Sequence, residues 1–155
     1  MSDLRKEFFE VAEEMAEKDK DFIVIVGDLG FSFYENYAKK YPDQFLNIGC
    51  MEQSMIGIAS GMARAGKKPV VYSGAIFALM RPYEQVRDDV AYNNTNVKIV
   101  GTGASGFLGF THNLGESESV ENLLKGLPNI LSLKPESKEE LKKCLSIDGP
   151  MFIKI

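Results

Sequence analysis

The stretch NIGCMEQSMIGIASG, residues 47–61, holds a single acidic residue, Glu52, at the head of an otherwise uncharged run. Apolar residues recur along it at helical spacing on two faces, which predicts a helix that is buried on most sides. Glu52 then lies in the first turn, where the positive end of the helix dipole favours a carboxylate. Position alone favours a stabilising carboxylate over a functional one, so the surrounding sequence has to decide.

Outward from this stretch, apolar runs alternate with helical patterns along the whole chain of 155 residues. The runs Phe22–Val26, Pro69–Tyr72 and Val97–Val100 are continuous, which is typical of parallel strands buried on both faces. The alternation predicts an α/β fold, one domain over residues 1–155, with an open, mainly parallel sheet between two layers of helices. We expect one helix over Met80–Ala91.

Composition excludes several function classes. A formal net charge of −4 provides no basic surface for nucleic acid or an anionic membrane. No apolar run approaches the ~20 residues of a membrane span, and Ser2–Lys20 is too charged for a signal peptide. Cys50 and Cys144 are far apart and have no metal-ligand spacing. We therefore expect a cytoplasmic protein with reduced thiols and no metal site of its own.

The unusual residues of the chain gather in the loops that follow the predicted strands. These loops are Gly27–Ser32, Ile48–Glu52, Ser73–Phe77 and Gly101–His112. In parallel α/β sheets, ligands bind at the carboxyl ends of the strands, so this placement raises the functional weight of Glu52. A dinucleotide fingerprint and a P-loop are absent after the first strand, and the glycines from Gly101 onward open a long loop rather than a helix.

Several short motifs, taken together and in order, resemble one family. The chain is similar to the central, pyrimidine-binding domain of transketolases, and above all to the C-terminal section of transketolases encoded as two polypeptides. The motifs that carry the resemblance are residues 47–55, 59–69, 80–92, 97–101, Thr111-His112, 127–129 and 149–150.

The resemblance implies that the chain binds the aminopyrimidine half of thiamine diphosphate. It assigns to Glu52 a hydrogen bond with N1′ of that ring. A carboxylate in this position favours the imino tautomer at the 4′ position, which removes the C2 proton of the thiazolium. Family membership thus replaces the helix-dipole interpretation of Glu52 with a catalytic one.

Five further residues receive roles from the same resemblance. His112 matches a catalytic histidine near the cofactor amino group and the substrate oxygens, and Phe77 matches a phenylalanine that packs on the aminopyrimidine. Asp28 matches an acidic residue near the cofactor across a subunit interface, and Met51 and Met55 could line the pocket. Packing in the core remains open for Phe77 and the methionines, as does a turn role for Asp28.

The resemblance also implies a partner. Nothing in the sequence matches the family motif that holds the cofactor diphosphate and Mg²⁺, nor a C-terminal transketolase domain. We therefore expect a diphosphate-binding N-terminal-section subunit to hold the Mg²⁺ and to share the cofactor, in an α2β2 assembly. The expected reaction is two-carbon ketol transfer between sugars or sugar phosphates, active only with the partner chain.

Two departures from the family pattern leave alternatives open. Gly74 stands where a second pocket aromatic is usual, and Leu108 replaces an acidic residue that would bind a sugar hydroxyl. One alternative is another thiamine diphosphate enzyme, such as a 2-oxo acid decarboxylase or a deoxyxylulose-phosphate synthase-like enzyme. Others are a non-catalytic interaction subunit and an unrelated α/β domain that binds a small ligand.

Overall fold

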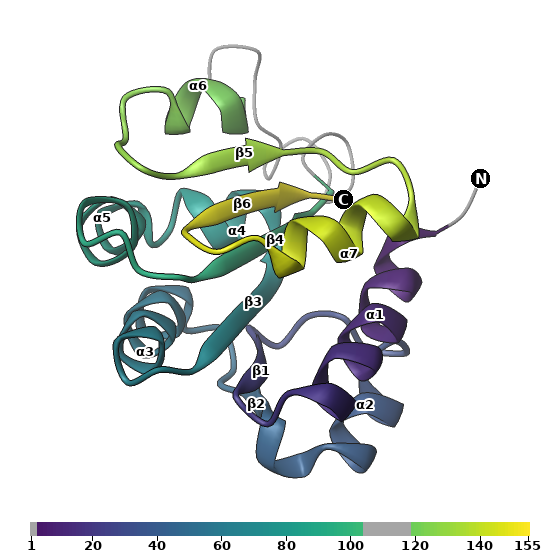
Figure 1. Ribbon diagram of the computed structural model, residues 1–155. Coiled ribbons are helices and arrows are strands. Elements are labelled where there is room, and N and C mark those ends of the chain that lie inside the picture. Colours follow the sequence, from purple (N-terminus) through teal and green to yellow (C-terminus); the bar gives the residue numbers. More distant parts are fainter. Residues whose placement is uncertain (1–2, 104–118) are drawn as a thin grey trace.

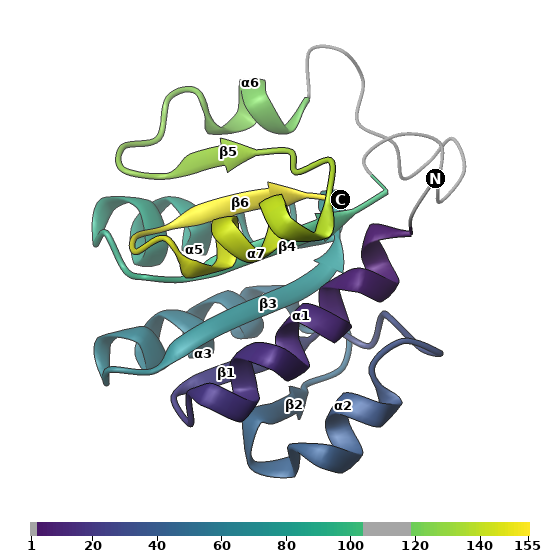
Figure 2. The same ribbon diagram turned by 45° about the vertical axis from the view of Figure 1, so that its right-hand side comes forward.

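A computed structural model describes residues 3–103 and 119–155. Its centre is a six-stranded sheet in the order β2-β1-β3-β4-β6-β5, in which every neighbouring pair is parallel (Figure 2). The strands are β1 (Phe22–Val26), β2 (Phe45–Asn47), β3 (Lys68–Gly74), β4 (Lys98–Thr102), β5 (Leu131–Leu133) and β6 (Met151–Lys154). The predicted parallel sheet is confirmed.

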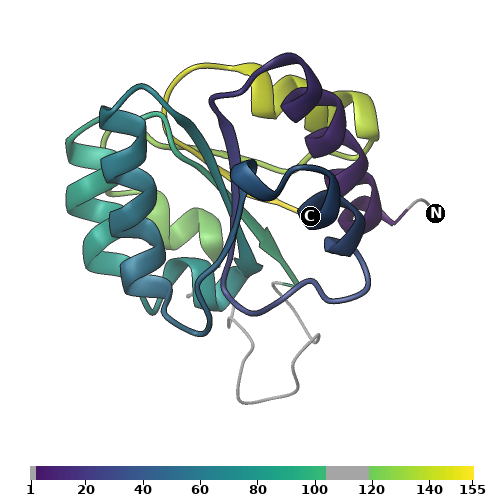
Figure 3. The ribbon, with the colours of Figure 1, turned by 90° about the horizontal axis from the view of Figure 1, so that it is seen from below.

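Helices cover both faces of this sheet, as predicted (Figures 1 and 3). One face carries α1 (Leu4–Lys18), α2 (Glu35–Lys40) and α7 (Lys138–Ser146), with the short 3₁₀ turn η1 (Pro42–Gln44) before β2. The other face carries α3 (Glu52–Arg64), α4 (Ala75–Leu79), α5 (Tyr83–Gln85), η2 (Val86–Tyr92) and α6 (Val120–Leu124).

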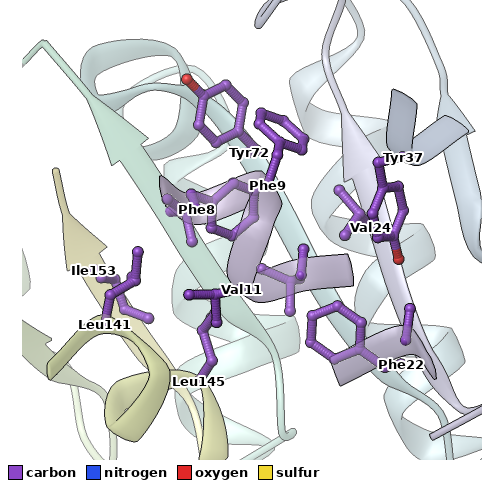
Figure 4. Packing of buried hydrophobic residues seen from close by; sticks show 14 of the residues in the cluster. Phe8, Phe9, Val11, Phe22, Val24, Tyr37, Tyr72, Leu141, Leu145 and Ile153 are labelled. Carbon is purple, nitrogen blue, oxygen red and sulfur yellow. The ribbon is translucent and has the colours of Figure 1, made fainter. Parts of the chain in front are cut away.

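The strands read as apolar runs because the sheet is buried on both sides. Every residue of β1 and of β4 is buried, whereas β2 and β5 at the two edges are short and partly exposed. On the α1 face, Phe8 stacks on Tyr72 at 5.2 Å between ring centroids, and Phe9 packs against both (Figure 4). This aromatic cluster fixes α1 across the middle of the sheet.

The predicted helix over Met80–Ala91 is wrong in its boundaries and its type. The chain forms α4 before it, breaks at Arg81-Pro82, and continues through α5 into η2, which is a π-helix. Pro82 has no N–H to donate and restricts the residue before it, which explains the break. The segment 73–77 is likewise strand and helix rather than a loop, because β3 runs to Gly74 and α4 begins at Ala75.

Helix α3 is less buried than its composition predicts. Met55, Ile56 and Ala59 are fully buried against the sheet, but Met51 and Ile58 are among the exposed large apolar residues. Apolar residues on several sides of a helix predict burial only when all those sides have a neighbour. Here one side of α3 faces outward in the isolated chain.

The strand order has one reversal that matters for the site. From β1 the chain moves to β2 on one side, and then returns to place β3 on the other side of β1. Such a switch point opens a crevice at the carboxyl ends of the strands. Helix α3 begins directly after β2 at this end. Among the described helices, none combines the length and apolarity that crossing a bilayer requires.

Candidate functional site

Glu52 is a buried carboxylate at the first residue of α3. Its exposed fraction is 4%, and the preceding residue, Met51, provides no side-chain cap. The turn before it is tightly held: Gly49 adopts a φ of +73°, and its N–H donates to Asn47 Oδ1 at 3.0 Å. This turn delivers Glu52 to the helix start, where free backbone N–H groups and the helix dipole favour a negative charge.

The carboxylate of Glu52 has one charged partner among the described residues, Arg81. Arg81 Nη1 donates to Glu52 Oε1 at 2.8 Å. The same guanidinium lies over the ring of Phe77, with Cζ at 3.9 Å from the ring centroid. Glu52, Phe77 and Arg81 come from three separate segments, and together they form what we call the carboxylate–aromatic corner.

The corner opens into a pocket of about 450 Å³ at the head of α3. Its walls are the residues Cys50, Met51, Glu52, Gln53, Ser54 and Arg81. Nearly half of the Arg81 side chain is exposed here (45%), whereas the Glu52 side chain is not. The arrangement therefore presents one carboxylate oxygen and one aromatic face to a group that enters from solvent.

The end of β1 packs tightly against this region. A Cβ on Gly27 would stand 3.6 Å from Met55 Sδ and from Ser73 Oγ, and 3.7 Å from the carbonyl oxygen of Gly49. Ser73 Oγ is buried and has no hydrogen-bond partner among the described residues. A glycine at position 27 thus lets β1, β3 and the turn before α3 meet at the switch point.

Asp28, the next residue, joins the ends of β1 and β2. It has a φ of +52°, its N–H donates to Asn47 Oδ1 at 3.1 Å, and Asn47 Nδ2 donates to Asp28 Oδ1 at 3.4 Å. Its carboxylate is exposed at the carboxyl edge of the sheet. The position suits both the turn role and the cofactor role that the sequence left open.

The structure brings together part of the predicted set. Glu52 and Phe77 meet through Arg81, and Met51 borders the pocket with its side chain largely exposed. Met55 is fully buried in the core beneath Gly27. His112 lies outside the described residues, as does Leu108. Gly74 ends β3 and precedes α4, so no side chain extends from that position into the corner.

Arg81 is the residue that sequence reasoning missed, since Arg-Pro at a helix start suits plain backbone geometry. One local signal was available: Phe77 and Arg81 are four residues apart, a spacing at which side chains on a helix meet. The ion pair with Glu52 spans 29 positions in the sequence and leaves no such signal.

Comparison with known proteins identifies the family. The model of the transketolase pyrimidine-binding domain matches residues 1–148. The chain belongs to this family. The transketolase pyrimidine-binding domain described here is 34% identical, over 97% of its length, to half (50%) of an apulose-4-phosphate transketolase chain of Phocaeicola vulgatus, one of the two polypeptides of a split enzyme. It is also 34% identical, over 95% of its length, to about a quarter (24%) of the 1-deoxy-D-xylulose-5-phosphate synthase of Halothermothrix orenii.

A solved structure agrees with these matches. A split-gene transketolase, described as an inactive β4 tetramer, superposes with a TM-score of 0.81 and 29% identity, over 97% of this chain and 49% of the other. The pyrimidine-binding domain thus spans about half the length of the split-enzyme relatives it matches. Among residues 3–103 and 119–155, no group of three or more His, Cys, Asp or Glu side chains could hold a metal ion.

Proposed function

We propose that this chain is a pyrimidine-binding subunit of a thiamine diphosphate-dependent, transketolase-like transferase. The enzyme would move a two-carbon ketol unit between sugars or sugar phosphates. Family membership supports the reaction class. The single observation that carries the site is the buried carboxylate of Glu52, held at a helix start beside an aromatic ring.

The carboxylate–aromatic corner fits the aminopyrimidine half of the cofactor. A planar ring with N–H donors needs a hydrogen-bond acceptor at its edge and a flat apolar surface at its face. Glu52 Oε1 is such an acceptor, and the Phe77 ring is such a surface. The planar guanidinium of Arg81 already uses both.

Each residue of the site has a defined task in this proposal. Glu52 would accept a hydrogen bond from N1′ of the ring and hold a proton there, and Phe77 would pack on the ring face. Met51 would border the open side, Met55 would support the pocket from below, and Asp28 would approach the cofactor from the end of β1. When bound, thiamine diphosphate supplies the carbon acid that ketol transfer requires.

His112 completes the proposed catalytic pair with Glu52. It lies in the segment after β4, which is the loop at the carboxyl end of a central strand. Loops at this edge carry the binding residues of parallel α/β sheets. Its imidazole would exchange protons with the substrate oxygens, because histidine changes charge near neutral pH.

The diphosphate and its Mg²⁺ need a second polypeptide. Mg²⁺ prefers an octahedral set of oxygen ligands, and the described residues offer no such cluster. We infer that a diphosphate-binding N-terminal-section subunit holds both and shares the cofactor, in an α2β2 assembly. The exposed side of α3, which carries Ile58, would face that partner. We place the enzyme in the cytoplasm, where its exposed Cys50 stays reduced.

The decisive experiment reconstitutes the complete site. The neighbouring reading frame of ~250–300 residues with the diphosphate motif would be co-expressed with this chain, and C2 proton exchange of thiamine diphosphate followed by NMR. We expect Glu52→Gln to slow exchange by at least about 100-fold, because the proton partner of N1′ is lost. Glu84→Gln, an exposed carboxylate on α5, is the matched control.

The outcomes separate the candidate functions. Equal exchange rates in Glu52→Gln and the unmodified chain would sink the assignment of Glu52. Failure of the reconstituted complex to bind cofactor would favour a non-catalytic interaction subunit. Circular dichroism of both variants establishes that the fold is retained.

A second candidate reaction is supported by the similarity to 1-deoxy-D-xylulose-5-phosphate synthase. That reaction class would use a 2-oxo acid donor instead of a ketose. Feeding the reconstituted enzyme pyruvate with an aldose phosphate, and separately a ketose phosphate with the same acceptor, distinguishes the two. Product from the ketose alone supports the transketolase reaction, whereas carbon dioxide release from pyruvate supports the alternative.

A further inference from the structure

The guanidinium of Arg81 occupies the place that the proposed function reserves for the aminopyrimidine ring. It donates to Glu52 Oε1 at 2.8 Å and lies 3.9 Å from the centroid of Phe77. A ring that donated to the same carboxylate and stacked on the same face would overlap the guanidinium. The two groups therefore exclude each other from the corner.

The physical reason for this arrangement lies in the burial of Glu52. A buried carboxylate without a partner is strongly destabilising, because the low-dielectric interior does not replace the water it lost. Arg81 supplies the missing charge and hydrogen bond while no ring is present. Its planar, delocalised guanidinium is the side chain best suited to pair with a carboxylate and to stack on an aromatic ring at once.

Arg81 is also placed so that it can leave. It lies at the break between α4 and α5, directly before Pro82, and nearly half of its side chain is exposed. Among the described residues, Glu52 is its only ion-pair partner. A rotation of this side chain toward solvent needs no rearrangement of a helix, and side-chain rotations at exposed positions are fast.

We propose that Arg81 is a placeholder that closes the aminopyrimidine corner in the empty subunit and is displaced when the ring binds. The inference rests on the proposed function and adds a residue that sets the affinity for the cofactor. Only the fraction of molecules with Arg81 displaced is competent to bind, so the observed dissociation constant is the intrinsic one divided by that fraction. Removal of the side chain therefore strengthens binding.

The test measures binding instead of turnover. The probe is 4-amino-2,5-dimethylpyrimidine titrated into the chain and followed by calorimetry or NMR, and thiamine diphosphate with Mg²⁺ titrated into the complex with the partner. We expect Arg81→Ala to bind both about tenfold more tightly than the unmodified chain. Arg81→Lys should lie between them, since an ammonium pairs with Glu52 but does not stack as a plane.

The matched control is Arg87→Ala. Arg87 is a similarly exposed arginine that pairs with Asp88 and lies over Tyr92, away from the corner. It should leave both affinities unchanged. A second readout is the Nε–H signal of Arg81 in the ring-free chain, which should shift when the probe is added and in Glu52→Gln.

Equal or weaker binding of the ring by Arg81→Ala overturns the placeholder, and weaker binding would mean that Arg81 contacts the bound cofactor. An Arg81 signal that does not respond to bound ring overturns it as well. These results leave the proposed function intact as long as Glu52→Gln still abolishes C2 exchange in the complex. If the unmodified complex binds no thiamine diphosphate, the proposed function fails, and the placeholder fails with it.

Discussion

At the scale of single residues, a buried charge reveals what the fold has arranged around it. Glu52 is tolerated because Arg81 pairs with it, and that arginine comes from a corner created by Pro82. Lys98, the first residue of β4, is the other buried charge of note, with an exposed fraction of 3%. Its Nζ donates to the carbonyl oxygen of Gly149 at 2.6 Å and to Asn96 Oδ1.

Burial lowers the pKa of Lys98 from 10.5 to about 8, although the nearby Asp148 opposes the change. The folded chain thus binds this proton less tightly than the unfolded chain. Between the two pKa values the unfolded state holds more protons, so the free energy of unfolding rises with pH in that window. Below about pH 8, the full cost of burying the charge is present.

We predict that Lys98→Met removes this dependence. From about pH 7 to about pH 9.5, the free energy of unfolding of the unmodified chain should rise by about 2 kcal/mol relative to that of the variant. Urea unfolding followed by circular dichroism at several pH values measures the difference. Parallel curves for the two proteins would mean that Lys98 does not titrate in this range.

At the scale of elements, the site depends on how closely α4 approaches the sheet. A Cβ on Gly101, in β4, would stand 2.9 Å from the Cα of Ala75 and 2.6 Å from Phe152 Cζ. The first residue of α4 therefore lies directly on β4, and α4 carries Phe77 into the corner. The π-helix η2 is held nearby, because the carbonyl oxygen of Asp89 accepts from Ser60 Oγ of α3 at 2.8 Å and from Thr95 Oγ1 at 2.9 Å.

Gly101→Ala should displace α4, because the backbone of Ala75 cannot move aside as a flexible side chain would. Overpacking of this kind costs about 1–3 kcal/mol. We expect lower stability in chemical unfolding and weaker cofactor binding by the reconstituted enzyme, since Phe77 shifts with the helix.

The matched control is Gly61→Ala, in α3, where an added Cβ has nothing within 4 Å. Alanine in an open helical position should instead stabilise the chain by about 0.5–1 kcal/mol. The opposite signs separate a close contact from a general effect of glycine replacement. A neutral Gly101→Ala would contradict the role of close packing at α4.

At the scale of the whole molecule, the sheet separates two apolar clusters, and the site lies where the α3 layer meets the carboxyl ends of the strands. The α3 layer is not fully covered in the isolated chain, since the Ile58 side of α3 faces outward (39% exposed). A partner that completes the cofactor site has to approach this end of the molecule.

We predict that Ile58→Lys weakens association with the diphosphate-binding partner by about tenfold or more, as expected for a buried apolar contact at an interface. Sedimentation of mixtures of the two subunits measures it. Ile147→Lys is the control, because Ile147 is similarly exposed (45%) but precedes β6 at the amino ends of the strands. Equal losses from both variants would contradict an interface centred on α3.

Much of this molecule follows from local sequence. Continuous apolar runs predicted β1, β3 and β4, and alternation with helical segments predicted the parallel sheet, because strands buried on both faces leave no polar side. The caps of α1 and α7 were also readable: Asp3 accepts from the N–H of Arg5 and Ser137 from that of Glu140. Glu52 stood out as an isolated charge in an uncharged run.

Only the tertiary structure decided three other features. The outward side of α3 depends on which neighbours surround it, and the π-helix η2 depends on hydroxyl donors from Ser60 and Thr95. The pairing of Glu52 with Arg81 joins residues 29 positions apart. Sequence periodicity reports contacts within one element, whereas a buried ion pair is set by how separate elements pack. The chain thus declared Glu52 by itself, and the fold alone selected the side chain that covers it.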